Sequence, residues 1–116
     1  ATIVRSMATY PEYVGGTDRL CTELTRASAG RIIAKVGAEG VYCAAVPGAE
    51  LGIALKVEDG ARRAAEPALL AVLHALGVLS DDEFGVLARF AEPVVRNTRG
   101  ENVGELRAIV ELTPHA

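Results

Sequence analysis

The sequence predicts an α+β domain in which helices cover an antiparallel sheet. Three segments rich in Ile, Val and Ala lie at residues 31–36, 41–46 and 51–57, and four-residue connections that contain glycine separate them. Short strands joined by such turns are typical of an antiparallel meander. Helical patterns precede and follow the meander, and alternation over 105–112 predicts a C-terminal strand that completes the sheet. Because strands and helices are grouped rather than alternating, we expect one α+β domain over residues 1–116.

Composition excludes several classes of function. Of the 116 residues, 50% are hydrophobic and 4% aromatic, and the net charge is -3 at pH 7. Nucleic-acid binding needs a concentrated basic surface, which an acidic chain with scattered arginines does not predict. No apolar run approaches the ~20 residues of a membrane span, and the first residues lack a signal-peptide pattern. We therefore expect a cytoplasmic protein with reduced thiols that binds neither nucleic acid nor membrane.

Two helices are expected before the sheet. Residues 2–14 place apolar side chains along one helical face, and Pro11 and the glycines that follow should end this helix. Thr17 or Asp18 can cap the next helix, because a short side-chain oxygen accepts a hydrogen bond from a free backbone N–H. This second helix should end at Gly30. Its buried side carries Leu20, Cys21 and Leu24.

The third strand predicts two unlike faces, because side chains alternate across a strand. The face expected to join the core carries Leu51, Ile53, Leu55 and Val57. The opposite face is small and partly polar, with Gly52, Ala54, Lys56 and Glu58.

Two further helices are expected after the meander. The first runs to about Leu76, and Pro67 either begins its main part or kinks it. Its buried stripe comprises Leu69, Leu70, Val72, Leu73 and Leu76. Ser80 and Glu83 have the spacing of a capping box at the start of a helix over 81–91. The buried side of that helix comprises Phe84, Leu87, Ala88 and Phe90.

The residues alone show no complete catalytic site. A serine with a lysine base would appear as Ser-x-x-Lys, and a hydrolase elbow as Gly-x-Ser-x-Gly; neither motif is present. The cysteines have no CxxC or repeated ligand spacing, so we expect no metal and no cofactor in this chain. We expect His74 in the core or at its edge, and Cys43 as a small buried side chain. Cys21 has no evident activating partner, and both a structural and a nucleophilic role stay open for it.

Lys35 occupies an unusual position for a lysine. It ends a segment that is otherwise Ile, Ala and Val, directly before the Gly37 turn, and the chain has only one other lysine. A lysine held there can lower the pKa of a neighbouring lysine base or receive a substrate carboxylate. Alternatively, its stem packs against the sheet and its ammonium reaches water.

Four stretches of the sequence resemble the asparaginase II family, the rhizobial-type L-asparaginases. They are AKVGAEGVYCAAVP and LGIALKVEDGARRA in the centre, MATYPEYVGGTDRLCTEL before them, and NTRGENVGELRA near the end. The resemblance covers nearly the whole chain and is to the C-terminal portion of those proteins; Asp18 departs from it, where a glycine is expected. The family resembles serine β-lactamases and serine-dependent glutaminases, which implies that the sheet is part of a β-lactamase/glutaminase-like α/β/α sandwich.

The resemblance also assigns roles to residues. In that superfamily a Lys-x-Gly triplet ends a strand that lines the active site, and the triplet that Lys35 begins matches it. The resemblance implies that Lys35 tunes the protonation of the nucleophile's base and helps to hold the amino-acid substrate. It places Gly37, Ala38 and Glu39 at the substrate, with the Ala38 N–H as half of an oxyanion hole. Cys21 matches a cysteine near the family's site.

The reaction that the resemblance implies is the hydrolysis of L-asparagine to aspartate and ammonia through an acyl-enzyme. The serine nucleophile, its Ser-x-x-Lys base and the cysteine segments thought to bind zinc belong to the family's N-terminal portion. We therefore expect this chain to be a C-terminal portion that is inactive without the N-terminal half. Apolar surface left without that half predicts self-association. A choice between asparagine and glutamine rests on residues outside this sequence.

Two other interpretations stay open. The chain is a non-catalytic binding or assembly domain that retains the fold, or it is an independent thiol enzyme that uses Cys21. Ammonia release restored by a Ser-x-x-Lys-bearing segment would separate the asparaginase portion from the binding domain. Labelling of Cys21 by a mild alkylating reagent, with activity lost in step, would favour the thiol enzyme.

Overall fold

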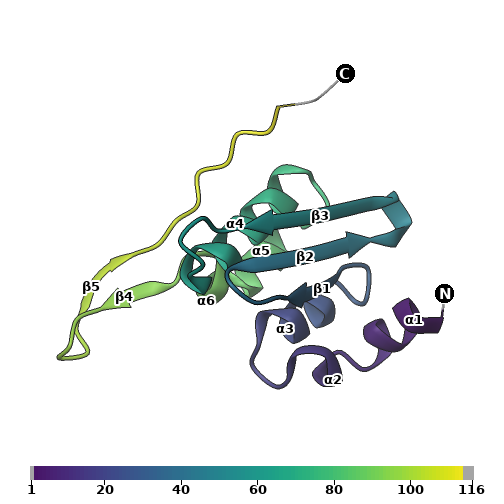
Figure 1. Ribbon diagram of the computed structural model, residues 1–116, viewed down its shortest axis with the longest axis horizontal. Helices are drawn as coiled ribbons and strands as arrows, with labels where there is room; N and C mark the ends of the chain where they lie inside the picture. Colours follow the sequence, from purple (N-terminus) through teal and green to yellow (C-terminus); the bar gives the residue numbers. More distant parts are fainter. Residues whose placement is uncertain (1, 114–116) are drawn as a thin grey trace.

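The computed structural model describes residues 2–113, and its centre is a three-stranded antiparallel sheet (Figure 1). The strands in spatial order are β1 (Ile33–Val36), β2 (Val41–Val46) and β3 (Leu51–Lys56). A short 3₁₀ turn, η1 (Pro47–Ala49), joins β2 to β3. The expected meander is therefore confirmed, with slightly shorter outer strands.

Helices lie before and after the sheet in the chain. Within residues 2–113, the helices before it are α1 (Thr2–Thr9), α2 (Glu12–Gly15) and α3 (Leu20–Ala27). Those after it are α4 (Arg62–Ala75), α5 (Asp81–Val86) and α6 (Ala88–Ala91). In this part of the chain, no helix has the length and hydropathy needed to cross a membrane. The grouping of helices around an antiparallel sheet confirms the α+β class.

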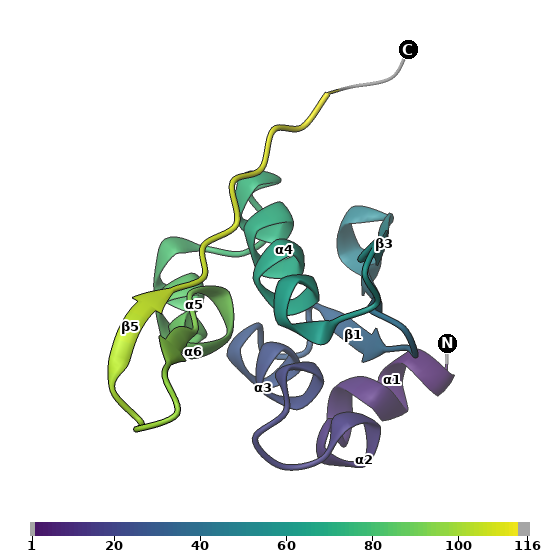
Figure 2. The same cartoon turned by 60° about the vertical axis from the view of Figure 1, so that its left-hand side comes forward.

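The core lies between the sheet and the helices α3 and α4, which pack against it (Figure 2). Along β2 the side chains alternate, so that Tyr42 and Ala44 are buried while Cys43 and Ala45 are exposed. The side chains with at most 1% of their surface exposed include Leu20, Cys21, Leu24, Ile32, Leu69, Leu70, Leu73, Leu79 and Leu87. Burial of each such leucine contributes about 2 kcal/mol to folding. The core therefore consists mainly of aliphatic side chains, with Tyr42 as its one aromatic residue at this level of burial among residues 2–113.

The first helix ends before Pro11, as expected, but the expected continuation to residue 14 is wrong, because the residues after Pro11 form a separate short helix, α2. Proline has no N–H to donate, and its ring crowds the carbonyl of the residue four positions earlier, which favours a helix break at this position. The apolar face of α1 is also largely uncovered. Ile3 is 76% exposed and Val4 is 36% exposed.

The expected cap at Thr17 or Asp18 is also wrong. α3 begins after Arg19, which makes no side-chain cap, and Asp18 has a left-handed φ of 59°. The hydroxyl of Thr22, inside α3, donates instead to the carbonyl oxygen of Gly16. This contact ties the end of α2 to the first turn of α3.

The buried side of α4 is confirmed for its central leucines and wrong for Leu76, which is 42% exposed. The helix ends at Ala75, and the chain changes direction at Gly77, which has φ of 77°. Leu76 therefore lies at the end of the helix and is not covered by the core. Pro67 lies inside α4, which is continuous through it.

The capping box at the start of α5 is confirmed. The N–H of Glu83 donates to Ser80 Oγ at 3.2 Å, and the N–H of Ser80 donates to Glu83 Oε1 at 3.0 Å. The buried side expected over 81–91 is right for Leu87 and wrong for Ala88, which is exposed. The segment is two short helices, and the break at Leu87 turns Ala88 outward.

The C-terminal strand expected over 105–112 is wrong. Only its first residue belongs to a strand, β5 (Asn102–Glu105), which pairs with β4 (Val94–Arg96) in a separate two-stranded sheet. A tight turn joins β4 to β5: the Gly100 N–H donates to the Asn97 carbonyl oxygen at 3.0 Å, and Gly100 has φ of 79°. Such a turn favours pairing between its own flanks. The remaining residues, 106–113, have no regular secondary structure.

Candidate functional site

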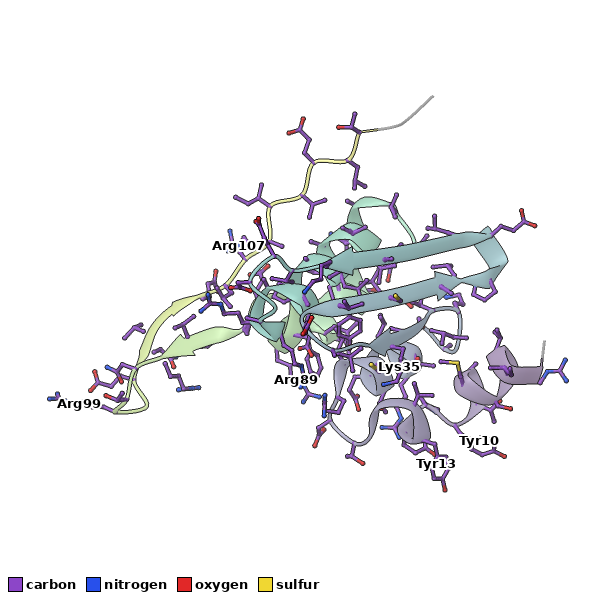
Figure 3. All side chains as sticks on the ribbon, viewed as in Figure 1. Tyr10, Tyr13, Lys35, Arg89, Arg99 and Arg107 are labelled. Carbon is purple, nitrogen blue, oxygen red and sulfur yellow. The ribbon has the colours of Figure 1, made fainter. Side chains whose placement is uncertain are left out.

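Lys35 lies at the end of β1, on the face of the sheet opposite the core (Figure 3). Its partner across β2 is Cys43, which pairs in turn with Ala54 of β3. The Lys35 ammonium is exposed and donates to the carbonyl oxygen of Val36 at 3.3 Å. It makes no ion pair with any carboxylate in residues 2–113. Lys35 is therefore an exposed cation whose charge is free to meet a ligand.

A shallow cavity of about 220 Å³ lies beside Lys35. Val4 and Met7 of α1 form one wall, and Cys43 and Ala45 of β2 contribute to the floor. The cavity is mostly apolar, and Lys35 is its one charged lining residue. Small side chains on this face thus leave room next to the ammonium.

The turn after Lys35 is tightly fastened. The Gly37 N–H donates to the Val41 carbonyl oxygen at 2.8 Å, and the Lys56 ammonium donates to the Glu39 carbonyl oxygen. The Val57 N–H donates to the Gly40 carbonyl oxygen at 2.9 Å. These bonds hold the turn against the end of β3.

The amide of Ala38 is exposed at this turn. Its N–H donates no hydrogen bond to any residue in 2–113, whereas the neighbouring Gly37 N–H is engaged. A Cβ added to Gly37 would lie 3.1 Å from Val41 Cβ, so glycine keeps this strand end narrow. Glu39 is exposed at the tip, with a left-handed φ of 56°. The expected substrate-binding residues thus lie on the turn that follows β1, the strand that carries Lys35.

Cys21 lies apart from this turn. It is 1% exposed, and its Sγ is 3.0 Å from the hydroxyl of Tyr42, which points into the core. Because Tyr42 is next to Cys43, it faces the side of the sheet opposite Lys35. The structure therefore does not bring the Cys21 thiol and the Lys35 ammonium together.

Tyr42 is a residue that the sequence analysis missed. Burial, reinforced by the hydrogen bond with Cys21, raises the pKa of Tyr42 well above its usual value. The hydroxyl therefore stays protonated and serves the thiol as a hydrogen-bond partner rather than as a base. The alternation of side chains along β2 could have predicted this residue. It places the Tyr42 hydroxyl on the buried face, where a polar group needs a hydrogen-bond partner.

The expectation for Cys43 is wrong, because its side chain is exposed rather than buried. Its neighbours Tyr42 and Ala44 occupy the core face, so alternation turns Cys43 outward. His74 lies at the edge of the core, as expected; its Nε2 is 2.6 Å from Asp81 Oδ1, and its ring stacks on Phe84. Among residues 2–113, no three His, Cys, Asp or Glu side chains are placed to hold one metal ion.

The fold and this turn define a small α+β domain that presents the Lys35 ammonium near a strand end and the free N–H of Ala38 on the turn that follows. The family model described as L-asparaginase II matches residues 1–108. The chain therefore belongs to the asparaginase II family. No curated protein matches the chain significantly.

Proposed function

We propose that the chain supplies the Lys35 end of an L-asparaginase-type active site, which hydrolyses L-asparagine to aspartate and ammonia. Membership of the asparaginase II family supports this reaction class. Two observations support the site: the exposed Lys35 ammonium makes no ion pair within residues 2–113, and the N–H of Ala38 in the turn that follows is free. The serine nucleophile and its Ser-x-x-Lys base come, in this proposal, from an N-terminal half outside this sequence.

Lys35 has two roles in the proposed site. Its ammonium attracts the α-carboxylate of the amino-acid substrate, because opposite charges attract strongly where water is excluded. It also lowers the pKa of a neighbouring lysine, since a like charge disfavours the protonated form. That lysine can then accept the serine proton at neutral pH.

The Ala38 N–H is proposed as one of two donors to the oxyanion of the tetrahedral intermediate. A donor that is fixed before the reaction stabilises developing charge without reorganisation. The hydrogen bonds of Gly37 and of the Glu39 carbonyl oxygen supply this rigidity. Glu39 itself is a weaker candidate, because its exposed side chain makes no hydrogen bond or ion pair within residues 2–113 that would orient it toward a substrate.

Zinc enters no step of this proposal. The resemblance assigns zinc to cysteine segments of the N-terminal portion, and the described residues offer no converging set of ligands for it. Both cysteines here are free thiols.

We place the protein in the cytoplasm, where free thiols persist.

Ammonia release from L-asparagine tests the proposal. The chain alone should release none, and coexpression with a Ser-x-x-Lys-bearing segment of the family should restore release. In the restored complex, Lys35→Ala should lower kcat/KM by about 100-fold or more, as loss of an electrostatic contact to the transition state does. Arg99→Ala is the control, because it removes a cation from the distant hairpin (Figure 3). L-glutamine in a parallel arm reports the substrate preference.

Two results would contradict this function. Release by the chain alone that Lys35→Ala abolishes would mean that a nucleophile lies within these residues. Asparagine binding by calorimetry without turnover, in the presence of the Ser-x-x-Lys segment, would favour the binding domain. The thiol enzyme is the weakest alternative, because Cys21 is buried and occupied by Tyr42.

A further inference from the structure

The segment after β5, residues 106–112, has the pattern of a strand without a strand partner. Leu106, Ala108 and Val110 are half-buried, whereas Arg107 and Ile109 between them are exposed, with Ile109 at 96%. The chain is extended here and runs beside α4 in both views (Figures 1 and 2). The half-buried side chains line shallow cavities together with small α4 residues, among them Ala64, Pro67, Ala68, Ala71 and Ala75.

The backbone of this segment is unpaired. The Leu106 N–H donates to the Pro93 carbonyl oxygen at 2.9 Å, at the base of the β4–β5 hairpin. Beyond it, residues 107–113 make no backbone hydrogen bond to any other residue in 2–113. An extended segment with free N–H and C=O groups is a template for pairing with another strand.

We propose that residues 106–112 pair antiparallel with the same segment of a second copy of this chain, about a two-fold axis at Ile109. In this register Arg107 of one copy lies opposite Glu111 of the other, twice, and the two Ile109 side chains lie opposite each other. Leu106 then faces Leu112 on the other side of the ribbon. The segment is thus complementary to itself in charge and in hydropathy, which is what an isologous interface requires.

Neighbouring registers lack this complementarity. An axis at Ala108 places Glu105 opposite Glu111, and an axis at Arg107 places this residue opposite itself. Like charges directly opposite each other are destabilising. A slip of one residue sets the apolar face of one copy against the polar face of the other. Charge and alternation therefore select the register centred on Ile109.

The same register accounts for how the segment meets its own domain. Residues directly opposite in an antiparallel pair share a face, so Leu106, Ala108 and Val110 of both copies point to one side, where each copy has its α4. The exposed Ile109 gains an apolar partner. In the single chain Arg107 contacts Glu105 at 2.8 Å and Glu92 at 3.6 Å, and both contacts are exposed. Such contacts hold the arginine weakly and leave it free to bind Glu111 of the second copy.

Charge exchange tests this register, with the dimer dissociation constant measured by analytical ultracentrifugation. Glu111→Arg creates two like-charge pairs and should weaken the dimer about 30-fold, the combined effect of two cross-strand pairs changing sign. The double variant R107E/E111R restores both pairs in reverse and should recover most of that loss. Glu101→Arg makes the same change of charge in the hairpin and should leave the dimer unchanged.

Cross-linking gives a second readout that does not depend on charge. In a Cys43→Ala background, which removes the exposed native thiol, Ile109→Cys places two thiols opposite each other on the axis. Mild oxidation should give a disulfide-linked dimer, whereas Val103→Cys, also exposed, should form no disulfide link between copies. A wild-type chain that stays monomeric at high concentration would overturn the proposal, as would a dimer that Glu111→Arg leaves intact. Both readouts are independent of asparaginase activity.

Discussion

The turn between β1 and β2 requires glycine at position 40. The cost of replacing Gly40 by alanine can be compared with the same replacement at other glycines of the chain. Gly40 has φ of 75°, where an L side chain is strained. A Cβ added to it would lie 2.9 Å from Val57 Cβ and 3.1 Å from the carbonyl carbon of Gly60. The second contact is with backbone, which cannot turn aside as a flexible side chain can. Gly40→Ala should therefore be destabilising for two reasons, a strained backbone φ and a steric clash of the added Cβ.

A series of three variants separates these two effects. Gly52→Ala in β3 meets neither, because nothing lies within 4 Å of the added Cβ, and it should stabilise the fold by about 0.5 kcal/mol through the lower entropy of the unfolded chain. Gly77→Ala has φ of 77° and open space, so only strain acts, and it should cost about 1 kcal/mol after the same entropic gain. Gly40→Ala adds an overpacking term and should cost about 3 kcal/mol in total.

Urea unfolding followed by circular dichroism gives the free energy of unfolding of each variant. The free energy of unfolding should fall in the order Gly52→Ala, wild type, Gly77→Ala, Gly40→Ala. If Gly40→Ala and Gly77→Ala unfold at the same urea concentration, the close contact with Gly60 does not exist. If Gly40→Ala equals Gly52→Ala, the backbone conformation of the turn is wrong as well. The slope of the unfolding curve should stay constant, since the surface exposed on unfolding does not change.

Three further predictions concern single side chains. The pKa of Glu83 is held below its ordinary value chiefly by the hydrogen bond from Arg31, so the stability it contributes is present above pH 4.5 and is lost as the pH falls through the lower folded value. Glu83→Gln should therefore lower stability at neutral pH and flatten its acid limb in unfolding curves; an unchanged acid limb would refute the contact. An alkylating reagent should add one label per folded chain, at Cys43, and a second at Cys21 only in urea, as counted by mass spectrometry. Tyr42→Phe should cost about 1 kcal/mol in urea unfolding and should hasten labelling of Cys21, because the thiol loses its partner; unchanged labelling would contradict the pairing.

Elements that are determined by residues close together in the chain could be predicted from the sequence, and those that depend on distant partners could not. The capping box at Ser80 and the meander follow from residues a few positions apart, and both are confirmed. The strand over 105–112 failed because alternation predicts an extended chain but does not choose its partner, and the turn at Asn97 supplied a nearer one. The prediction for Cys43 was wrong because cysteine is usually a buried residue type, whereas here the alternation of side chains along β2 decides the face. Tyr42 faces the core, so its neighbour Cys43 faces outward. The alternating pattern of residues 106–112 nevertheless persists without a sheet.

The candidate site was found from sequence only in part. The position of Lys35 at a strand end before glycine was visible in the residues, whereas its proposed role came from family resemblance. The contact between Cys21 and Tyr42 joins residues far apart in the chain, so no local pattern announced it. Cys21 lies on α3, on the core side of the sheet, and therefore does not reach the turn after Lys35.

The two lysines of the chain show why that turn has a free cation. Both lie on the outward face of the sheet, Lys35 on β1 and Lys56 on β3. The ammonium of Lys56 is engaged by the carbonyl oxygen of Glu39, so it fastens the turn and is not available to a ligand. Lys35 has only a weak contact with its neighbouring carbonyl and borders open space above Cys43 and Ala45. Lys56 therefore fastens the turn, whereas the ammonium of Lys35 stays exposed beside it, as the proposed binding of a substrate carboxylate by Lys35 requires.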